Sequence, residues 1–200
     1  MQQPCEVFFD IETKRWFDET GNRKLEDLGV SIVCMYVRPD DKMLSFWEKD
    51  FDQMWHYFRR ADRIIGFNTL RFDVPVLAPY APPDFAKLKH FDIYKELKLA
   101  NDSHGASLNA IAKQTLGKAK NDSGENATLY WQLGDAESLT KLEKYCRMDV
   151  EITRDVYDFA IANKYLQYID RWNTPRQVEV DFAYPKEDSS TQPSLFQITT

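Results

Sequence analysis

Hydrophobic residues crowd one short stretch near the N-terminus, residues 6–13. Its apolar members are β-branched or aromatic, which favours a buried central strand: Val7, Phe8, Phe9 and Ile11. Asp10 and Glu12 interrupt this run two positions apart, so both side chains should point to the same face of the strand. Two carboxylates buried together repel each other unless a cation lies between them. The pair therefore indicates a site for a hard divalent cation, and the alternative is a strand whose last residues have reached solvent.

The rest of the hydrophobic pattern predicts an α/β fold. We expect further strands at residues 29–37, 43–48, 63–67 and 90–94, with a polar, mobile loop at 118–126. Helices are expected at residues 51–60, at 68–78, from a Ser107 cap to a closing Gly117, and from Asp135 onward in a long run that contains a kink. A three-strand antiparallel meander followed by alternating helices and strands predicts a mixed β-sheet flanked by α-helices.

Periodicity is lost after Trp172, where Pro, Ser, Thr and Gln dominate. Such a composition is typical of chain that buries too little apolar surface to fold. We therefore predict one domain at residues 1–172 and a flexible tail at residues 173–200.

Composition and charge narrow the classes of function. The chain has 200 residues, of which 43% are hydrophobic, enough for one sizeable core. A net charge of −6 argues against a general polyanion binder, but it allows an enzyme that grips a few nucleotides through metal ions. Cys5, Cys34 and Cys146 lack metal-type spacing, which predicts reduced thiols in a cytoplasmic protein. No apolar run approaches the roughly 20 residues of a membrane span, and no export signal is evident.

Polar residues that suit a catalytic site follow in two later segments. Asn68 and Asp73 come just after a short predicted strand, where ligands usually bind in α/β sheets. Asp73 could instead cap the helix that it precedes. Tyr145 and Asp149 lie four residues apart on one face of the long helix, and the alternative is a surface aspartate beside a core tyrosine.

These motifs, in this order, resemble a known family. Asp10-x-Glu12, Asn68-x-x-x-Phe72-Asp73 and Tyr145-x-x-x-Asp149 are similar to the motifs of the DEDD exonucleases of the ribonuclease H-like superfamily, in the tyrosine subgroup called DEDDy. The subgroup with histidine would carry it at the position of Lys144. The nearest likeness is to the 3′–5′ proofreading domain of family B DNA polymerases, over about residues 5–165. It rests on Phe9-Asp10-Ile11-Glu12-Thr13, Gly66-Phe67-Asn68, Phe72-Asp73-Val74-Pro75 and Tyr145-Cys146-Arg147-Met148-Asp149.

The resemblance implies a ribonuclease H-like mixed sheet and two-metal catalysis with Mg²⁺ or Mn²⁺. It implies that Asp10 bridges both ions, that Glu12 and Asp149 complete the site of the attacking water, and that Asp73 holds the second ion. Tyr145 would orient the water, and Asn68, Phe72 and Thr13 would contact substrate. Phosphodiester hydrolysis must activate water and stabilise both a pentacoordinate phosphorus and a departing alkoxide, which two ions about 4 Å apart can do.

We therefore expect a 3′–5′ exonuclease that trims single-stranded DNA to 5′-mononucleotides in replication, repair or recombination. Single strands are favoured because stacking of a few bases suffices and the acidic charge disfavours long duplex contacts. Three alternatives stay open: an exoribonuclease, a non-catalytic nucleic-acid-binding or clamp-binding module, and a small-molecule phosphohydrolase.

A short motif near the C-terminus suggests a partner. Gln192, Leu195 and Phe196 resemble the peptide by which bacterial replication and repair proteins dock on the sliding clamp, a glutamine followed three residues later by Leu-Phe. Pro193 departs from the usual leucine of that peptide. The alternative is a tail that folds back and buries Leu195 and Phe196 on its own domain.

Overall fold

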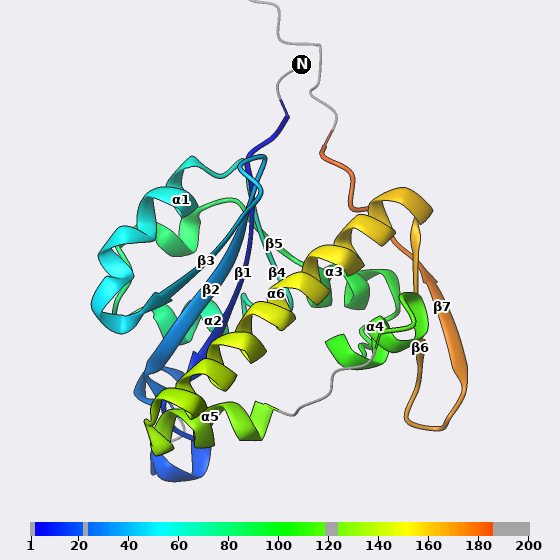
Figure 1. Cartoon of the computed structure of the whole chain (residues 1–200). Helices are drawn as coiled ribbons and strands as arrows, with labels where there is room; N and C mark the ends of the chain where they lie inside the picture. Colours follow the sequence, from blue (N-terminus) through cyan, green and yellow to red (C-terminus); the bar gives the residue numbers. More distant parts are fainter. Residues whose placement is uncertain (1–2, 22–23, 119–123, 186–200) are drawn as a thin grey trace, which may run out of the picture.

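The computed structural model describes residues 3–21, 24–118 and 124–185. Its centre is a five-stranded sheet in the order β3-β2-β1-β4-β5 (Figure 1). The strands are β1 (Glu6–Thr13), β2 (Val30–Arg38), β3 (Lys42–Trp47), β4 (Arg63–Gly66) and β5 (His90–Asp92). β1, β2 and β3 form the antiparallel meander, whereas β1, β4 and β5 run parallel to one another. The predicted mixed α/β sheet is confirmed, and β1 is its central strand.

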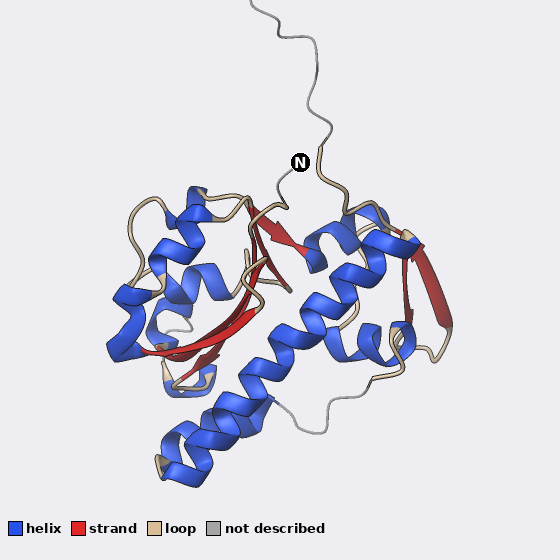
Figure 2. Ribbon diagram, turned by 45° about the horizontal axis from the view of Figure 1, so that its top comes forward, coloured by secondary structure: helices blue, strands red, loops and turns tan. Residues whose placement is uncertain are grey.

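Alternation along β1 divides the core into two clusters, one on each face of the sheet (Figure 2). Val7, Phe9 and Ile11 belong to the cluster that contains residues of α1 (Trp55–Arg60) and α2 (Asp73–Leu77). Phe8 belongs to the other cluster, with residues of α3 (Ile93–Ala100), α4 (Leu108–Thr115) and α6 (Ala136–Asn163). Asp10 and Glu12 share the parity of Phe8, so they face α6.

The long helix α6 crosses this second face as one uninterrupted helix. Asp135 caps its start by accepting a hydrogen bond from the Ser138 N–H at 3.0 Å, and Lys164 ends it in the left-handed conformation, with φ of 65°. A kink is expected from the length of this run, but α6 is one continuous helix and contains neither proline nor glycine, the usual causes of a kink. No helix in the described ranges combines the length and apolar character needed to cross a bilayer.

Several predicted boundaries are wrong by a few residues. The loop expected to reach residue 126 gives way to α5 (Gly124–Leu133), and the strand expected over 90–94 ends at Asp92, which caps α3. Residues 68–72 form a turn before α2, because Asn68 is left-handed, with φ of 63°. The helix expected over 51–60 begins as a 3₁₀ helix. Within the described ranges, the 3₁₀ helices are η1 (Phe17–Glu19), η2 (Leu25–Leu28), η3 (Glu48–Gln53) and η4 (Phe85–Lys87).

The segment predicted as the start of a flexible tail is folded as far as residue 185. β6 (Tyr165–Ile169) and β7 (Pro175–Glu179) form an antiparallel hairpin beside α4. Val178, Val180 and Phe182 are buried, and this alternation is an apolar strand signal hidden in a polar composition. The tail prediction is therefore corrected for residues 173–185.

A buried arginine fastens the end of this segment to the main sheet. Arg63 of β4 donates hydrogen bonds to the Phe182 carbonyl at 2.6 Å and to the Tyr157 hydroxyl at 2.8 Å. Tyr184 donates to Glu6 Oε1 at 3.0 Å, and the Arg63 guanidinium lies 3.8 Å from the Tyr184 ring centroid. The described chain thus ends beside the start of β1.

Candidate active site

Two carboxylates meet a cysteine near the end of β1. One oxygen each of Asp10 and Glu12 and the Sγ of Cys146 all lie within 4.8 Å of one another. The Cys146 thiol, on α6, is 3.6 Å from the Asp10 carbonyl oxygen and 3.9 Å from Asp10 Oδ2. The structure thus places Asp10 and Glu12 on the same face, as the spacing predicts.

The Cys146 thiol supports this cluster as a hydrogen-bond donor. Burial, together with the neighbouring Cys34 thiol and the charge of Asp10, raises the pKa of Cys146 well above its ordinary value. Cys146 therefore stays protonated and donates toward Asp10. The remaining oxygen donors suit a hard cation such as Mg²⁺ or Mn²⁺.

Asp73 lies beside the part of β1 that no longer pairs with β4. The parallel pairing of β1 and β4 ends at Phe8, and further along β1 the Ile11 N–H donates to the Asp73 carboxylate. Burial, with the nearby charges of Asp92 and Asp149, raises the pKa of Asp73 to about 7. α2 begins at Asp73 itself, with Phe72 in the position before it, so Asp73 lies in the first turn of the helix rather than at its cap position.

Asp149 and Tyr145 approach from α6. Both are only 7% exposed, so Asp149 is not the surface aspartate of the alternative reading. The charge of Asp149 is one of the causes that raise the pKa of Asp73, so the two carboxylates act on each other electrostatically. β1, α2 and α6 thus gather four buried or half-buried carboxylates, a donor set that would hold divalent cations.

The residues predicted to contact substrate line cavities beside these acids. Thr13 and Phe72 line a cavity of about 280 Å³ together with Glu12. Asn68 and Phe72 line a neighbouring cavity of about 770 Å³. Phe17 borders both cavities, and its ring centroid lies 6.3 Å from that of Phe72 in an edge-to-face arrangement.

Two contributors were missed from the sequence. Asp92 is buried and accepts hydrogen bonds from the N–H groups of Asn68 at 2.8 Å and Leu70 at 3.0 Å, which shapes the turn that delivers Asp73. An aspartate directly before a helical stretch is a cap signal that would have located it. No sequence signal marked Phe17. Gln192, Leu195 and Phe196 lie outside the described residues, so clamp docking stays a prediction.

Comparison with known proteins agrees with this geometry. The RNase H superfamily matches residues 7–161, and the chain belongs to that superfamily. A family B DNA polymerase from the hyperthermophilic archaeon Pyrobaculum calidifontis is structurally similar, with a TM-score of 0.60 and 17% identity over 80% of this chain. The match covers 25% of the polymerase, and at this identity it shows the fold alone. A search of curated proteins found no match. Superfamily and acidic cluster together indicate a nuclease.

Proposed function

We propose that this chain is a metal-dependent 3′–5′ exonuclease that releases 5′-mononucleotides from single-stranded DNA. The observation that carries the proposal is the meeting of Asp10 and Glu12 within 4.8 Å at the end of β1, with Glu12 lining an aromatic cavity and the buried Asp73 and Asp149 acting on each other electrostatically. These carboxylates come from three separate segments of the chain, and burying them together is unfavourable unless cations bind there. DNA replication, repair or recombination would supply such 3′ ends.

Two divalent cations, Mg²⁺ or Mn²⁺, fit this donor set. Asp10, Glu12 and Asp149 would hold one, and Asp10 with Asp73 would hold the other. When bound, such a pair of ions lowers the pKa of water and offsets the charge that develops on the phosphate and the leaving oxygen.

The side chains of this protein would then bind and orient the reactants. The Tyr145 hydroxyl, one helical turn before Asp149, would hold the attacking water by a hydrogen bond. Phe72 and Thr13 would contact the terminal nucleotide, because they line the same cavity as Glu12. Asn68 borders the next cavity and would contact the nucleotide before it.

The test is cleavage of a 5′-labelled single-stranded oligonucleotide with Mg²⁺ or Mn²⁺. The parent should give a ladder of successively shorter products, and a blocked 3′ end should prevent cleavage. Asp10→Ala should lower the rate by about a thousandfold or more, as loss of metal binding does. Asp52→Ala, an exposed acid in η3, is the matched control and should cleave like the parent.

An Asp10→Ala variant as active as the parent would overturn the proposal. Replacing the DNA by RNA of the same sequence tests the exoribonuclease alternative, which would be favoured by faster cleavage of RNA. Cleavage of a dinucleotide but of no longer strand would favour a small-molecule phosphohydrolase.

We also propose that Gln192, Leu195 and Phe196 dock the enzyme on a sliding clamp. Such a tether would raise the local concentration of an enzyme that grips only a few nucleotides. A purified bacterial clamp should retain the parent on a column and fail to retain Leu195→Ala/Phe196→Ala. Equal retention of the two proteins would remove the proposal.

A further inference from the structure

Three neighbouring cavities, each sharing lining residues with the next, form a series that leads away from the acidic cluster. The 280 Å³ cavity beside Glu12 shares Phe17 and Phe72 with the 770 Å³ cavity. The latter in turn shares the backbone stretch 105–107 with a cavity of about 700 Å³ under the β6–β7 hairpin. We call these three neighbouring cavities the side groove. It connects the candidate active site with a hairpin far away in sequence.

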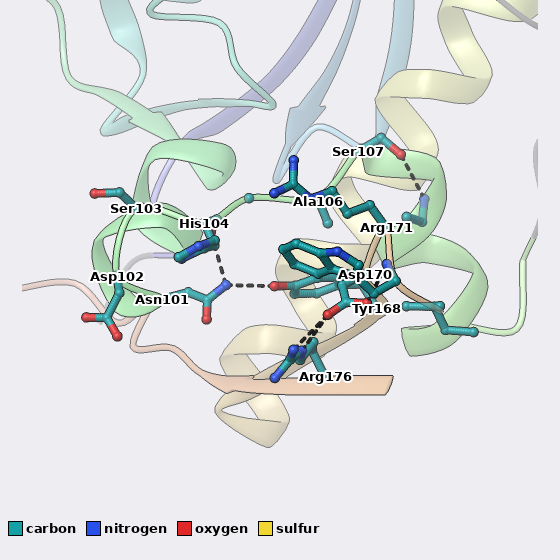
Figure 3. Close-up of a pocket in the computed structure, with 14 residues that line it drawn as sticks. Asn101, Asp102, Ser103, His104, Ala106, Ser107, Tyr168, Asp170, Arg171 and Arg176 are labelled. Atoms are coloured by element: carbon teal, nitrogen blue, oxygen red, sulfur yellow. Dashed lines mark hydrogen bonds and ion pairs between the residues drawn. The ribbon is translucent and has the colours of Figure 1, made fainter. Parts of the chain in front are cut away.

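The hairpin end of the side groove carries an exposed indole and a guanidinium. Trp172, in the turn between β6 and β7, is 61% exposed. The Arg171 guanidinium carbon lies 4.1 Å from its ring centroid. Figure 3 shows Arg171 and Arg176 on the hairpin side of this cavity, with Asn101 and His104 on the other. An exposed aromatic ring beside a guanidinium is the kind of surface on which the bases of single-stranded nucleic acid stack.

The turn that carries Trp172 is held in place by one aspartate. Asp170 accepts hydrogen bonds from the N–H groups of Trp172 and Thr174, both at 2.9 Å, and from Arg176 Nε at 2.8 Å. This network presents the indole on a preformed turn, so less conformational entropy is lost when a flat ligand stacks on it.

The charges along the groove suit a phosphate backbone. Arg176 neutralises Asp170 through its ion pair, at 2.8 Å. Among the described residues, Arg171 and Arg71 form no ion pair, and Arg71 lines the middle cavity. Positive groups in a groove that also presents aromatic rings are the features by which proteins bind single-stranded nucleic acid. Asp102 and Asp170 balance Arg171 and Arg176 in the hairpin cavity, and Arg71 supplies the positive charge of the middle cavity.

We propose that the side groove binds the nucleotides that precede the 3′ end, with one base stacked on Trp172 and the backbone beside Arg71 and Arg171. This inference rests on the proposed exonuclease function and adds the path by which a longer strand leaves the acidic cluster. It predicts a preference for strands long enough to reach the hairpin over dinucleotides.

The test compares a dinucleotide with a thymidine oligonucleotide of about ten residues, long enough to cross the groove and stack on the indole. Trp172→Ala should raise KM for the longer strand about tenfold, the usual effect of losing one stacked base. It should leave kcat for that strand and kcat/KM for the dinucleotide unchanged. Leu99→Ala, a 70% exposed apolar residue outside the groove, is the control for a general surface effect.

Binding is measured separately, by anisotropy of the 5′-fluorescein oligonucleotide in EDTA. Trp172→Ala and Arg171→Ala should each weaken binding, whereas Leu99→Ala should not. If the parent fails to hydrolyse but still binds in a Trp172-dependent way, the exonuclease proposal falls and the groove proposal stands. If hydrolysis occurs while KM and binding are the same for parent and Trp172→Ala, the groove proposal falls and the exonuclease stands.

Discussion

Asp73 shows how a functional side chain works against stability. It is 4% exposed, with two further carboxylates near enough to raise its pKa. Burying charge beside like charge destabilises the fold unless a cation offsets it. The Asp73 carboxylate accepts a hydrogen bond from the Ile11 N–H. The fold therefore sets the position of this carboxylate, while its charge suits a bound cation.

Asp73→Asn should therefore separate stability from metal binding. The amide keeps an oxygen for the Ile11 N–H and removes the repulsion, so the metal-free variant should gain about 1–2 kcal/mol of unfolding free energy. Addition of Mn²⁺ should raise the Tm of the parent and raise that of the variant much less. Asp84→Asn, an exposed acid, is the control for a change of net charge. A variant less stable than the parent without metal would contradict this reading of the cluster.

Titration of two tyrosines gives a prediction on pH. Burial and the charge of Glu6 raise the pKa of Tyr157 and of Tyr184, which both donate to Glu6 Oε1. A tyrosine whose pKa is higher in the folded than in the unfolded protein stabilises the fold. This stabilisation is complete below the unfolded pKa of about 10 and is lost as pH rises above it. Unfolding free energy should thus fall steeply above pH 10, and less steeply in Tyr184→Phe. Tyr57→Phe, on the other face of the sheet, should retain the slope of the parent.

The candidate acids could be named one by one from the sequence, whereas the residues that support them could not. Asp10, Glu12 and Asp149 stand out because they interrupt apolar runs of regular period. Cys146 and Asp92 support the site through contacts between distant segments: the thiol with Asp10, and the carboxylate with the turn at Asn68. Periodicity describes one segment at a time, so it carries no information on which segments meet.

Among helices and strands, boundaries were harder to predict than existence. The predicted strand at β5 extends too far because Phe91, Ile93 and Tyr94 look like one apolar run. In the structure the strand ends at Asp92, which caps α3. The hairpin β6–β7 was missed because each strand has only five residues and β7 is mostly exposed. The helix α6 was found, since its apolar stripe persists over many turns.

Asp92 is the cap on which two of these segments depend. Its carboxylate accepts from Tyr94 and Lys95 at the start of α3 and from Asn68 and Leu70 in the turn before α2. Asp92→Asn keeps one acceptor oxygen and places an amide against the Leu70 N–H, so it should destabilise the protein by about 1–3 kcal/mol. Denaturant unfolding would measure this. Asp135→Asn, at the exposed cap of α6, should lower the free energy of unfolding by less. An equal decrease in the two variants would contradict the double role of Asp92.

Across the chain, the folded unit extends past the predicted domain boundary. Phe182 is fully buried, and its ring centroid lies 5.0 Å from that of Phe91 on β5. Removing it would expose the apolar patch that it covers, and would leave Arg63 without the Phe182 carbonyl as an acceptor.

Two truncations test where the fold ends. A chain that stops after residue 185 should unfold at the Tm of the parent. A chain that stops after Trp172 should have a free energy of unfolding several kcal/mol lower than the parent, because it lacks the buried side chains of Val178, Val180 and Phe182. Thermal unfolding followed by circular dichroism would show this. Equal Tm values for the two truncated chains would restore residue 172 as the boundary.

The bond between Tyr184 and Glu6 fixes where the described chain leaves the molecule. Glu6 begins β1 and Glu12 lies near its far end, about 20 Å away at the rise of a strand. In Figure 1, the described chain starts and stops at the end of the sheet away from α5. An affinity tag or a fluorescent protein joined beyond residue 185 would consequently be attached at the end of the sheet opposite the acidic cluster. An enzyme immobilised through such a tag would present the acidic cluster to the solution.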